Sequence, residues 1–199
     1  MIRPVRADDA AEIAALQSYL AGPSPRLLAT AGALGTCLVA VGGADARADP
    51  TGPPDADGRP VGYALVIGDG DTHLAELVVH PDHRREGHGR ALVDAVVARQ
   101  APGTRVTLAV AADNDPARSL YDSAGFAPID RRPAFYESVD GCSDEAAVYA
   151  YDVPASGGGG GGPSAGARVW CWPPAAPPAA VCRTPPVGAR RRRARAPRP

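Results

Sequence analysis

The sequence has no lysine, few aromatic residues and no closely paired cysteines. All 21 basic residues are arginine, and aromatic residues make up 5% of the 199 positions. None of the four cysteines forms a C-x-x-C pair, so they indicate neither a zinc site nor a secreted disulfide framework. The N-terminus, MIRPVRADDA, lacks the apolar run of a signal peptide. We therefore expect a cytoplasmic protein.

Long hydrophobic runs are also scarce. The longest uncharged stretch, 27–44, has about the length of a membrane span, but four glycines and two threonines dilute its hydrophobicity. We interpret it as a helix end followed by a buried strand, and we expect no membrane association.

Acidic residues are missing from the C-terminal part of the chain. All 22 acidic residues lie in 1–152, where thirteen arginines leave a net charge of −9, whereas eight arginines give 154–199 a charge of +8. That segment also holds ten prolines and eight glycines in 46 positions, a composition that cannot bury enough apolar area to offset its chain entropy. The sequence predicts a folded domain over 1–153 and a disordered tail over 154–199.

Three interpretations of the tail are open. It is an exposed segment with no dedicated role, the product of a shifted reading frame in a GC-rich gene, or a basic arm. In the last case the arginine run 190–193 would bind nucleic acid or another acidic surface. The acidic domain itself does not look like a nucleic-acid-binding domain.

Strand and helix patterns alternate along 1–153, which predicts a mixed α/β domain. Helix signals include Asp8 as a cap at the start of the first helix, and Gly125 after the last. The expected helices run from Asp8 to about Leu20 and over 25–31, 91–100 and 113–124. The expected strands cover 2–6, 36–41, 61–67, 73–79, 105–111, 126–130 and 146–153.

A glycine-rich turn connects the expected strand 73–79 to the helix after it. Arg84, Gly87 and Gly89 form an R-x-x-G-x-G pattern, flanked by Arg85 and Arg90. Glycines let the backbone approach a ligand closely, and a helix N-terminus attracts negative charge. The pattern predicts a phosphate- or pyrophosphate-binding turn. It is neither a P-loop, because no Gly-Lys-Ser/Thr follows, nor a Rossmann fingerprint, because the third glycine is absent.

These residues resemble motif A of the GNAT acyl-CoA N-acyltransferases. A second block, 108–126, resembles the N-x-x-A-x-x-L-Y-x-x-x-G-F motif of that family, and 131–141 resembles ribosomal-protein-alanine N-acetyltransferases, the haloarchaeal members in particular. The resemblance covers about residues 1–153. It implies the GNAT fold, a mixed and mostly antiparallel sheet flanked by helices. The residues that match the second motif are Asn114, Ala117, Leu120, Tyr121, Gly125 and Phe126.

The resemblance also implies acetyl-CoA as co-substrate. The strand end at 77–79 would pair through its backbone with the pantetheine arm, the turn would wrap the pyrophosphate, and Asn114 would contact the cofactor arm. The expected cofactor-binding residues are Leu77, Val78, Val79, Arg84, Arg85, Glu86, Gly87, His88, Gly89, Arg90 and Asn114.

Two catalytic residues are expected. The resemblance places Tyr121 near the thioester as the general acid that protonates the leaving thiolate; its alternative is a core tyrosine on a helix face. The glutamate that resembles the base in the alanine-acetylating subgroup is replaced here by Ala109. Glu76 is the candidate replacement, acting directly or through water, and its alternative is a solvated strand carboxylate.

The four histidines cluster in sequence. Pro81 and the alternating directions of strand residues are expected to scatter His73, His80, His83 and His88, which show no regular ligand spacing. We expect loop or surface histidines and no metal.

Together these observations predict transfer of an acetyl group from acetyl-CoA to a primary amine, such as an N-terminal alanine or serine of a protein. Two alternatives are open: a small-molecule amine as acceptor, or a non-catalytic acyl-CoA-binding regulatory module that has lost its base. Arg131, Arg132 and Tyr136 lie where related enzymes shape the substrate mouth, and their alternative is surface packing.

Overall fold

The computed structural model describes residues 1–20, 35–42, 58–135 and 144–155. The expected short helix at 25–31, the candidate mouth residue Tyr136 and all but the first two residues of the expected tail lie outside these ranges. Among the helices that are described, none combines the length and the apolar character needed to cross a bilayer.

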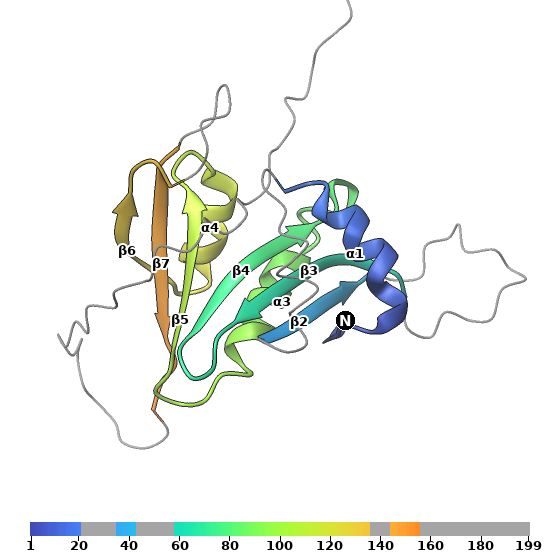
Figure 1. The fold of residues 1–199 in the computed structure, drawn as a ribbon, viewed down its shortest axis with the longest axis horizontal. Helices are drawn as coiled ribbons and strands as arrows, with labels where there is room; N and C mark the ends of the chain where they lie inside the picture. Colours follow the sequence, from blue (N-terminus) through green and yellow to red (C-terminus); the bar gives the residue numbers. More distant parts are fainter. Residues whose placement is uncertain (21–34, 43–57, 136–143, 156–199) are drawn as a thin grey trace, which may run out of the picture.

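A seven-stranded sheet forms the centre of the described structure (Figure 1), in the order β1-β2-β3-β4-β5-β7-β6. The pair β4–β5 is parallel and the other five neighbouring pairs are antiparallel. This is the mixed, mostly antiparallel sheet that the sequence predicts. The strands are β1 (Ile2–Pro4), β2 (Gly35–Val41), β3 (Pro60–Ile67), β4 (Thr72–Val79), β5 (Arg105–Ala111), β6 (Ala127–Arg132) and β7 (Ala146–Asp152).

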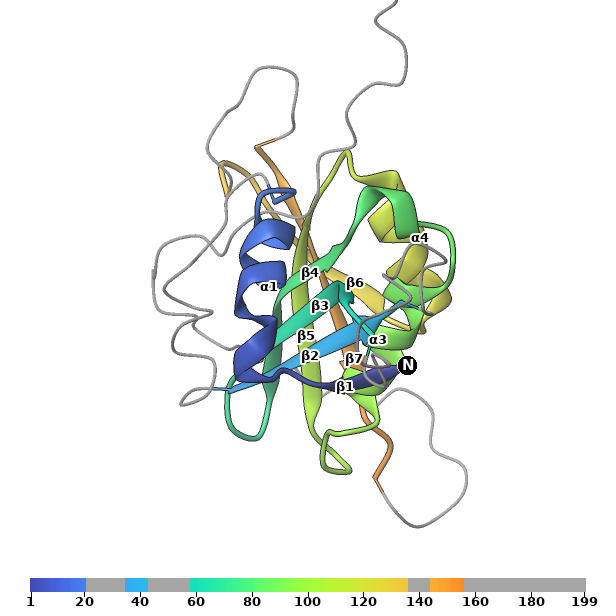
Figure 2. The ribbon, with the colours of Figure 1, turned by 90° about the vertical axis from the view of Figure 1, so that its right-hand side faces the viewer.

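Helices cover both faces of the sheet. The helix α1 (Ala10–Gln17) lies on one face, and α3 (His88–Val97) and α4 (Asp115–Ser123) lie on the other, as Figure 2 shows. Short 3₁₀ turns at Ala7–Asp9 and Pro81–His83 precede α1 and α3. The described helices and strands match the expected ones to within a few residues.

The start of α1 corrects one prediction. Asp9, not Asp8, directly precedes α1, and it completes a capping box around the 3₁₀ turn: its carboxylate accepts a hydrogen bond from the backbone N–H of Arg6 at 2.7 Å. The same carboxylate pairs with the guanidinium of Arg3 at 2.7 and 2.8 Å. Arg3 holds the pKa of Asp9 below its usual value. Because Arg3 belongs to β1, the ion pair fixes the edge strand to the start of α1.

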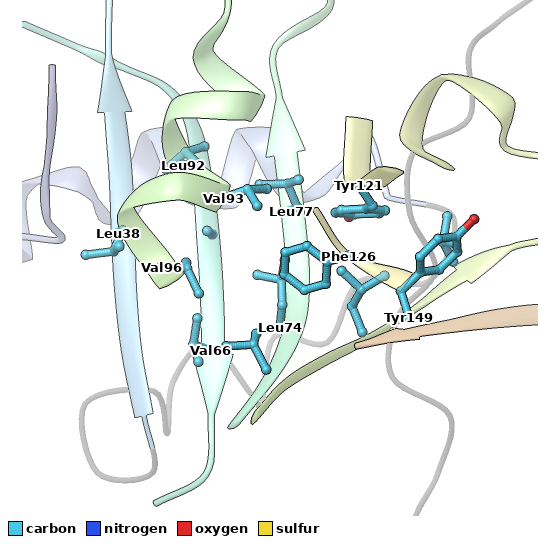
Figure 3. Close-up of a cluster of buried hydrophobic side chains, with 14 of the residues drawn as sticks. Leu38, Val66, Leu74, Leu77, Leu92, Val93, Val96, Tyr121, Phe126 and Tyr149 are labelled. Atoms are coloured by element: carbon cyan, nitrogen blue, oxygen red, sulfur yellow. The ribbon is translucent and has the colours of Figure 1, made fainter. Parts of the chain in front are cut away.

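Two apolar clusters, one on each face, hold the helices to the sheet. On the α1 face, Ile13 and Leu16 pack against β2, β3 and β4. On the other face α3 packs against the same strands, and α4 packs beside β5 and β7 (Figure 3). The side chains labelled there are Leu38, Val66, Leu74, Leu77, Leu92, Val93, Val96, Tyr121, Phe126 and Tyr149.

His73 is buried, so the expectation of a loop or surface histidine is wrong for this residue. It lies on β4 with 8% of its surface exposed, and its Nδ1 is 3.1 Å from Thr107 Oγ1 on β5. Burial, and to a lesser extent the charge of Arg132, lowers the pKa of His73 to about 4. The imidazole is therefore neutral at neutral pH.

This burial predicts an acid-sensitive fold. Between pH 6.5 and 4 the unfolded chain binds a proton at His73 that the folded chain does not, so stability falls as the pH falls through this window. We expect this histidine to account for a loss of about 3 kcal/mol in unfolding free energy between pH 7 and 4. The change His73→Gln should remove that part of the pH dependence, measured by urea unfolding in metal-free buffer. The more accessible His88→Gln serves as control, and an unchanged pH profile in His73→Gln would contradict the prediction.

Candidate functional site

The sheet splits between β4 and β5. These strands pair over three residues only, Thr72–Leu74 on β4 with Val106–Leu108 on β5. Beyond this point β5 continues alongside β7 as far as Ala111, whereas β4 continues alongside β3. The two strands visibly diverge in Figure 1. In the described structure the second half of β4 therefore has no strand partner on the β5 side, and this gap in the strand pairing is called the opening below.

The backbone of β4 has polar groups that point into this opening. The N–H of His80 donates to Val61 O on β3 at 2.8 Å. Because backbone groups alternate in direction along a strand, those of Leu77 and Val79 point to the opposite side, toward the split. Arg84 confirms the direction, since its Nε donates to Val79 O at 3.2 Å. Such an edge can pair with an extended ligand by main-chain hydrogen bonds.

The glycine-rich turn lies at the end of β4, beside the split. Arg85 and Gly87 both have left-handed backbone conformations, with φ of 69° and 87°. The first helical hydrogen bond of α3 runs from Ala91 N to Gly87 O. The N–H groups of His88, Gly89 and Arg90 belong to the first turn, where no earlier helical carbonyl is available. This arrangement can receive an anion.

The two sides of the turn differ in packing. A Cβ added at Gly87 would meet no atom within 4 Å, so the space outside the turn is open. A Cβ at Gly89 would lie 3.4 Å from Leu120 Cδ2 on α4, within ordinary contact distance. The turn is therefore open on the side of Gly87 and packed against α4 on the side of Gly89.

The Arg90 side chain is bound by two other groups of the protein. Its Nε contacts the carboxylate of Asp94 at 2.8 and 2.9 Å, and its Nη1 donates to Ser123 O at 2.8 Å. These contacts connect α3 to the end of α4. A role for the Arg90 side chain at a bound anion stays a prediction, as do the roles of the other candidate cofactor-binding residues.

Glu76 is a buried carboxylate, which overturns the alternative of a solvated strand residue. Only 1% of its surface is exposed. Its Oε2 accepts a hydrogen bond from the hydroxyl of Tyr63 on β3 at 2.7 Å and another from Nε2 of Gln17 on α1 at 3.4 Å. The buried thiol of Cys37 is affected by the charge of Glu76. Burial, and to a lesser extent this charge, raises the pKa of the thiol to about 12. The thiol is therefore protonated at neutral pH.

A β-bulge places Glu76 on the α1 face. Leu65 is opposite Glu76 and Val66 is opposite Leu74, which leaves Ala75 as an extra residue in β4. In a regular strand Glu76 would share the face of Leu74, two residues away. The extra residue instead puts Leu74 and Leu77 together in the cluster beneath α3 and turns Glu76 to the opposite face. Neither this bulge nor the two partners of Glu76 are predicted by the sequence patterns.

Ala109 lies on the same face as Glu76, across the split. Its neighbours Leu108 and Val110 belong to the apolar cluster beneath α3 and α4, so the side chain of Ala109 points to the α1 face. Glu76 on β4 and position 109 on β5 therefore flank the opening from its two sides.

Tyr121 lies on the other face of the sheet. It is 1% exposed, and its ring centroid is 6.0 Å from that of Phe126 and 6.1 Å from that of Tyr149 (Figure 3). Tyr121 therefore packs in the core, and its role as general acid stays a prediction. Asn114 caps α4, since its Oδ1 accepts from Ala117 N at 3.2 Å, and its contact with a cofactor likewise stays a prediction.

The histidines are not all scattered. His73 is inside the sheet. His83, in the turn before α3, and His88, at the start of α3, both contact Glu86. The expectation that the chain direction separates these side chains is wrong for this pair. The spacing H-x-x-E-x-H was the available signal in the sequence.

Comparison with known proteins agrees with this geometry. Residues 51–126 match the model of the Acetyltransferase (GNAT) family. Mycothiol acetyltransferase from Clavibacter sepedonicus is 49% identical over 70 residues, which are 35% of this chain and 22% of that protein. Mycothiol acetyltransferase from Parafrankia sp. is 57% identical over 42 residues, 21% of this chain and 13% of that protein. The chain thus spans less than a quarter of the length of these relatives.

Solved structures match over most of the domain. The ribosomal-protein-S18-alanine N-acetyltransferase from Escherichia coli superimposes with a TM-score of 0.62 at 23% identity, covering 79% of this chain and 96% of the other. Arabidopsis thaliana NAA60 in complex with acetyl-CoA gives a TM-score of 0.62 at 20% identity, covering 77% and 99%. At these identities the likeness concerns the fold. It shows that this chain has the same fold as these structures, and residues 51–126 match the Acetyltransferase (GNAT) family model.

Proposed function

We propose that this protein transfers an acetyl group from acetyl-CoA to a primary amine. The observation that carries the proposal is the split between β4 and β5, which opens beside the glycine-rich turn and has Glu76 on one face and Tyr121 on the other. A ligand threaded through this split would present its reactive end between a carboxylate and a phenol. A carboxylate can serve as the general base and a phenol as the general acid in the acylation of an amine by a thioester.

In this proposal the cofactor lies along β4. The pantetheine arm pairs with the backbone of Leu77 and Val79, and the pyrophosphate is received by the turn from Arg84 to Arg90. The helix N-terminus of α3 and the open space outside Gly87 support this placement. Solved relatives of the same fold include one described as a complex with acetyl-CoA.

The chemical step follows from the positions of the two groups. The amine must lose a proton before or as its nitrogen attacks the thioester carbonyl, after which the carbon–sulfur bond breaks and the thiolate takes a proton. Glu76 receives the amine proton through a water molecule, because its carboxylate is buried. Tyr121 supplies the proton to the thiolate. Tyr63 and Gln17 hold the carboxylate in position by their hydrogen bonds.

The proposed acceptor is a primary amine, without a narrower substrate class. The family match at 51–126 extends from before β3 to the end of α4, the part assigned here to the cofactor. The segments 21–34 and 136–143 lie outside the described residues. Both an N-terminal alanine or serine and a small amine are therefore included as acceptors. The charge of −9 over 1–153 favours a cationic amine in either class.

A thiol-release assay on the full chain tests the proposal. The panel contains acetyl-CoA with small amines and with short peptides that begin with alanine, serine or methionine. We expect turnover with one acceptor class, and a fall in kcat of about 10²-fold or more in Tyr121→Phe and in Glu76→Gln. Tyr151→Phe and Glu12→Gln are the matched controls and should retain turnover. Cofactor binding without turnover on any acceptor would contradict the proposed enzymatic activity. It would support the non-catalytic acyl-CoA-binding module that the alanine at position 109 suggests.

Alanine substitutions at two glycines of similar conformation distinguish an effect on acetyl-CoA binding from an effect on stability. Gly87 and Gly70 both have left-handed φ, 87° and 90°, and both have open space where a Cβ would be added. Gly87→Ala and Gly70→Ala should each lose about 1–2 kcal/mol of stability. Only Gly87→Ala should also weaken acetyl-CoA binding in calorimetry, and equal binding by both variants would argue against the turn as the phosphate site.

The role of Tyr63 as a positioning residue gives a separate prediction. Tyr63→Phe removes the 2.7 Å hydrogen bond to a buried carboxylate, which should cost about 2 kcal/mol of unfolding free energy. It should also lower kcat while leaving the KM for acetyl-CoA unchanged. In a double-mutant cycle the stability cost should shrink when Glu76→Gln is already present. Additive costs would mean that Tyr63 acts through packing alone.

A further inference from the structure

Three side chains around the glycine-rich turn converge on one point. Oε2 of Glu86 is 3.2 Å from Nδ1 of His83 and 3.3 Å from Nε2 of His88. One ligand atom from each of the three residues lies within 4.8 Å of the other two. The imidazole rings are nearly perpendicular, with centroids 6.2 Å apart and an interplanar angle of 74°, so they meet the carboxylate from different directions.

These separations suit a tetrahedral metal ion. Zinc binds histidine nitrogen and carboxylate oxygen at about 2.0–2.1 Å, and in a tetrahedron of that size two ligand atoms are about 3.3 Å apart. Both nitrogen–oxygen distances in the cluster already have this value. The two histidine nitrogens lie within 4.8 Å of each other, and an approach to about 3.3 Å would complete a face of the tetrahedron.

The backbone holds the three residues in a short, well-defined turn. His83 ends the 3₁₀ turn Pro81–His83, Glu86 precedes the left-handed Gly87, and His88 is the first residue of α3. The side chains of His83 and His88 are 24% and 18% exposed, so an ion can reach them from solvent without displacing the core.

His80 is close by but has other partners. Its Nδ1 accepts a hydrogen bond from the N–H of Asp82 at 3.2 Å, and its Nε2 is 3.1 Å from the hydroxyl of Tyr19. Both ring nitrogens are therefore used, and among the described residues the ligand set consists of two histidines and one glutamate.

We propose that His83, Glu86 and His88 form a binding site for a divalent transition-metal ion of the zinc type. Three protein ligands leave a fourth position for water or another oxygen ligand. Glu86 and His88 lie in the turn that the proposed function assigns to the pyrophosphate, but ion binding by these three side chains does not require acetyl transfer. An ion bound here would fix the turn that connects β4 to α3.

Cobalt titration of the full chain tests the site, with Co²⁺ as the spectroscopic probe and Zn²⁺ as the competitor. We expect visible d–d bands that saturate at one ion per chain and disappear on addition of Zn²⁺. Thiolate charge-transfer bands in the near ultraviolet should be absent, which distinguishes this site from cysteine ligation. Zn²⁺ should also raise the melting temperature, because an ion bound by the native state stabilises it.

The variants Glu86→Gln and His83→Gln should lose the d–d bands and the thermal shift. Asp82→Asn is the matched control, since Asp82 is an exposed carboxylate of the same loop outside the ligand set. Its metal binding should equal that of the wild type. Binding that is unchanged in Glu86→Gln and His83→Gln, or wild-type protein that shows no saturable d–d bands, would overturn the proposal.

Discussion

The short contact between β4 and β5 is the constraint on which the rest of the site depends. Three residue pairs hold the two strands parallel, and beyond Leu74 each strand follows a different neighbour. If the pairing continued, the backbone of Leu77 and Val79 would be used inside the sheet, and no ligand could reach it. The divergence converts an interior strand into an edge, placed directly before the glycine-rich turn.

One extra residue in β4 determines the face of the sheet on which Glu76 lies. The bulge at Ala75 turns Glu76 toward α1, where Tyr63 and Gln17 hydrogen-bond to it, while Leu77 remains beneath α3. A buried carboxylate is costly unless it has such partners. In the proposed function the base and the acid come from opposite faces of the sheet, with the split between them, and a base on β4 would remove the need for a carboxylate at position 109.

Local sequence patterns predict the strands, the helices and the R-x-x-G-x-G turn because each depends on neighbouring residues. The features that the sequence does not reveal depend on pairing across the sheet. Whether Glu76 is solvated or buried depends on a bulge relative to β3, and the burial of His73 depends on its register with Thr107. The cap at Asp9 depends on Arg3 in a separate strand. The meeting of His83 and His88 depends on a turn conformation with two left-handed residues.

Amide hydrogen exchange of Leu77 and Val79, followed by NMR with and without acetyl-CoA, tests whether the β5-facing edge of β4 pairs with an acyl-CoA arm. This pairing is the basis of the proposed function. It predicts that saturating acetyl-CoA slows exchange at these two amides, while the amides of β2, on the far side of β3, change little. Tight binding of acetyl-CoA with unchanged exchange at Leu77 and Val79 would contradict it, because the cofactor would then occupy some other part of the protein.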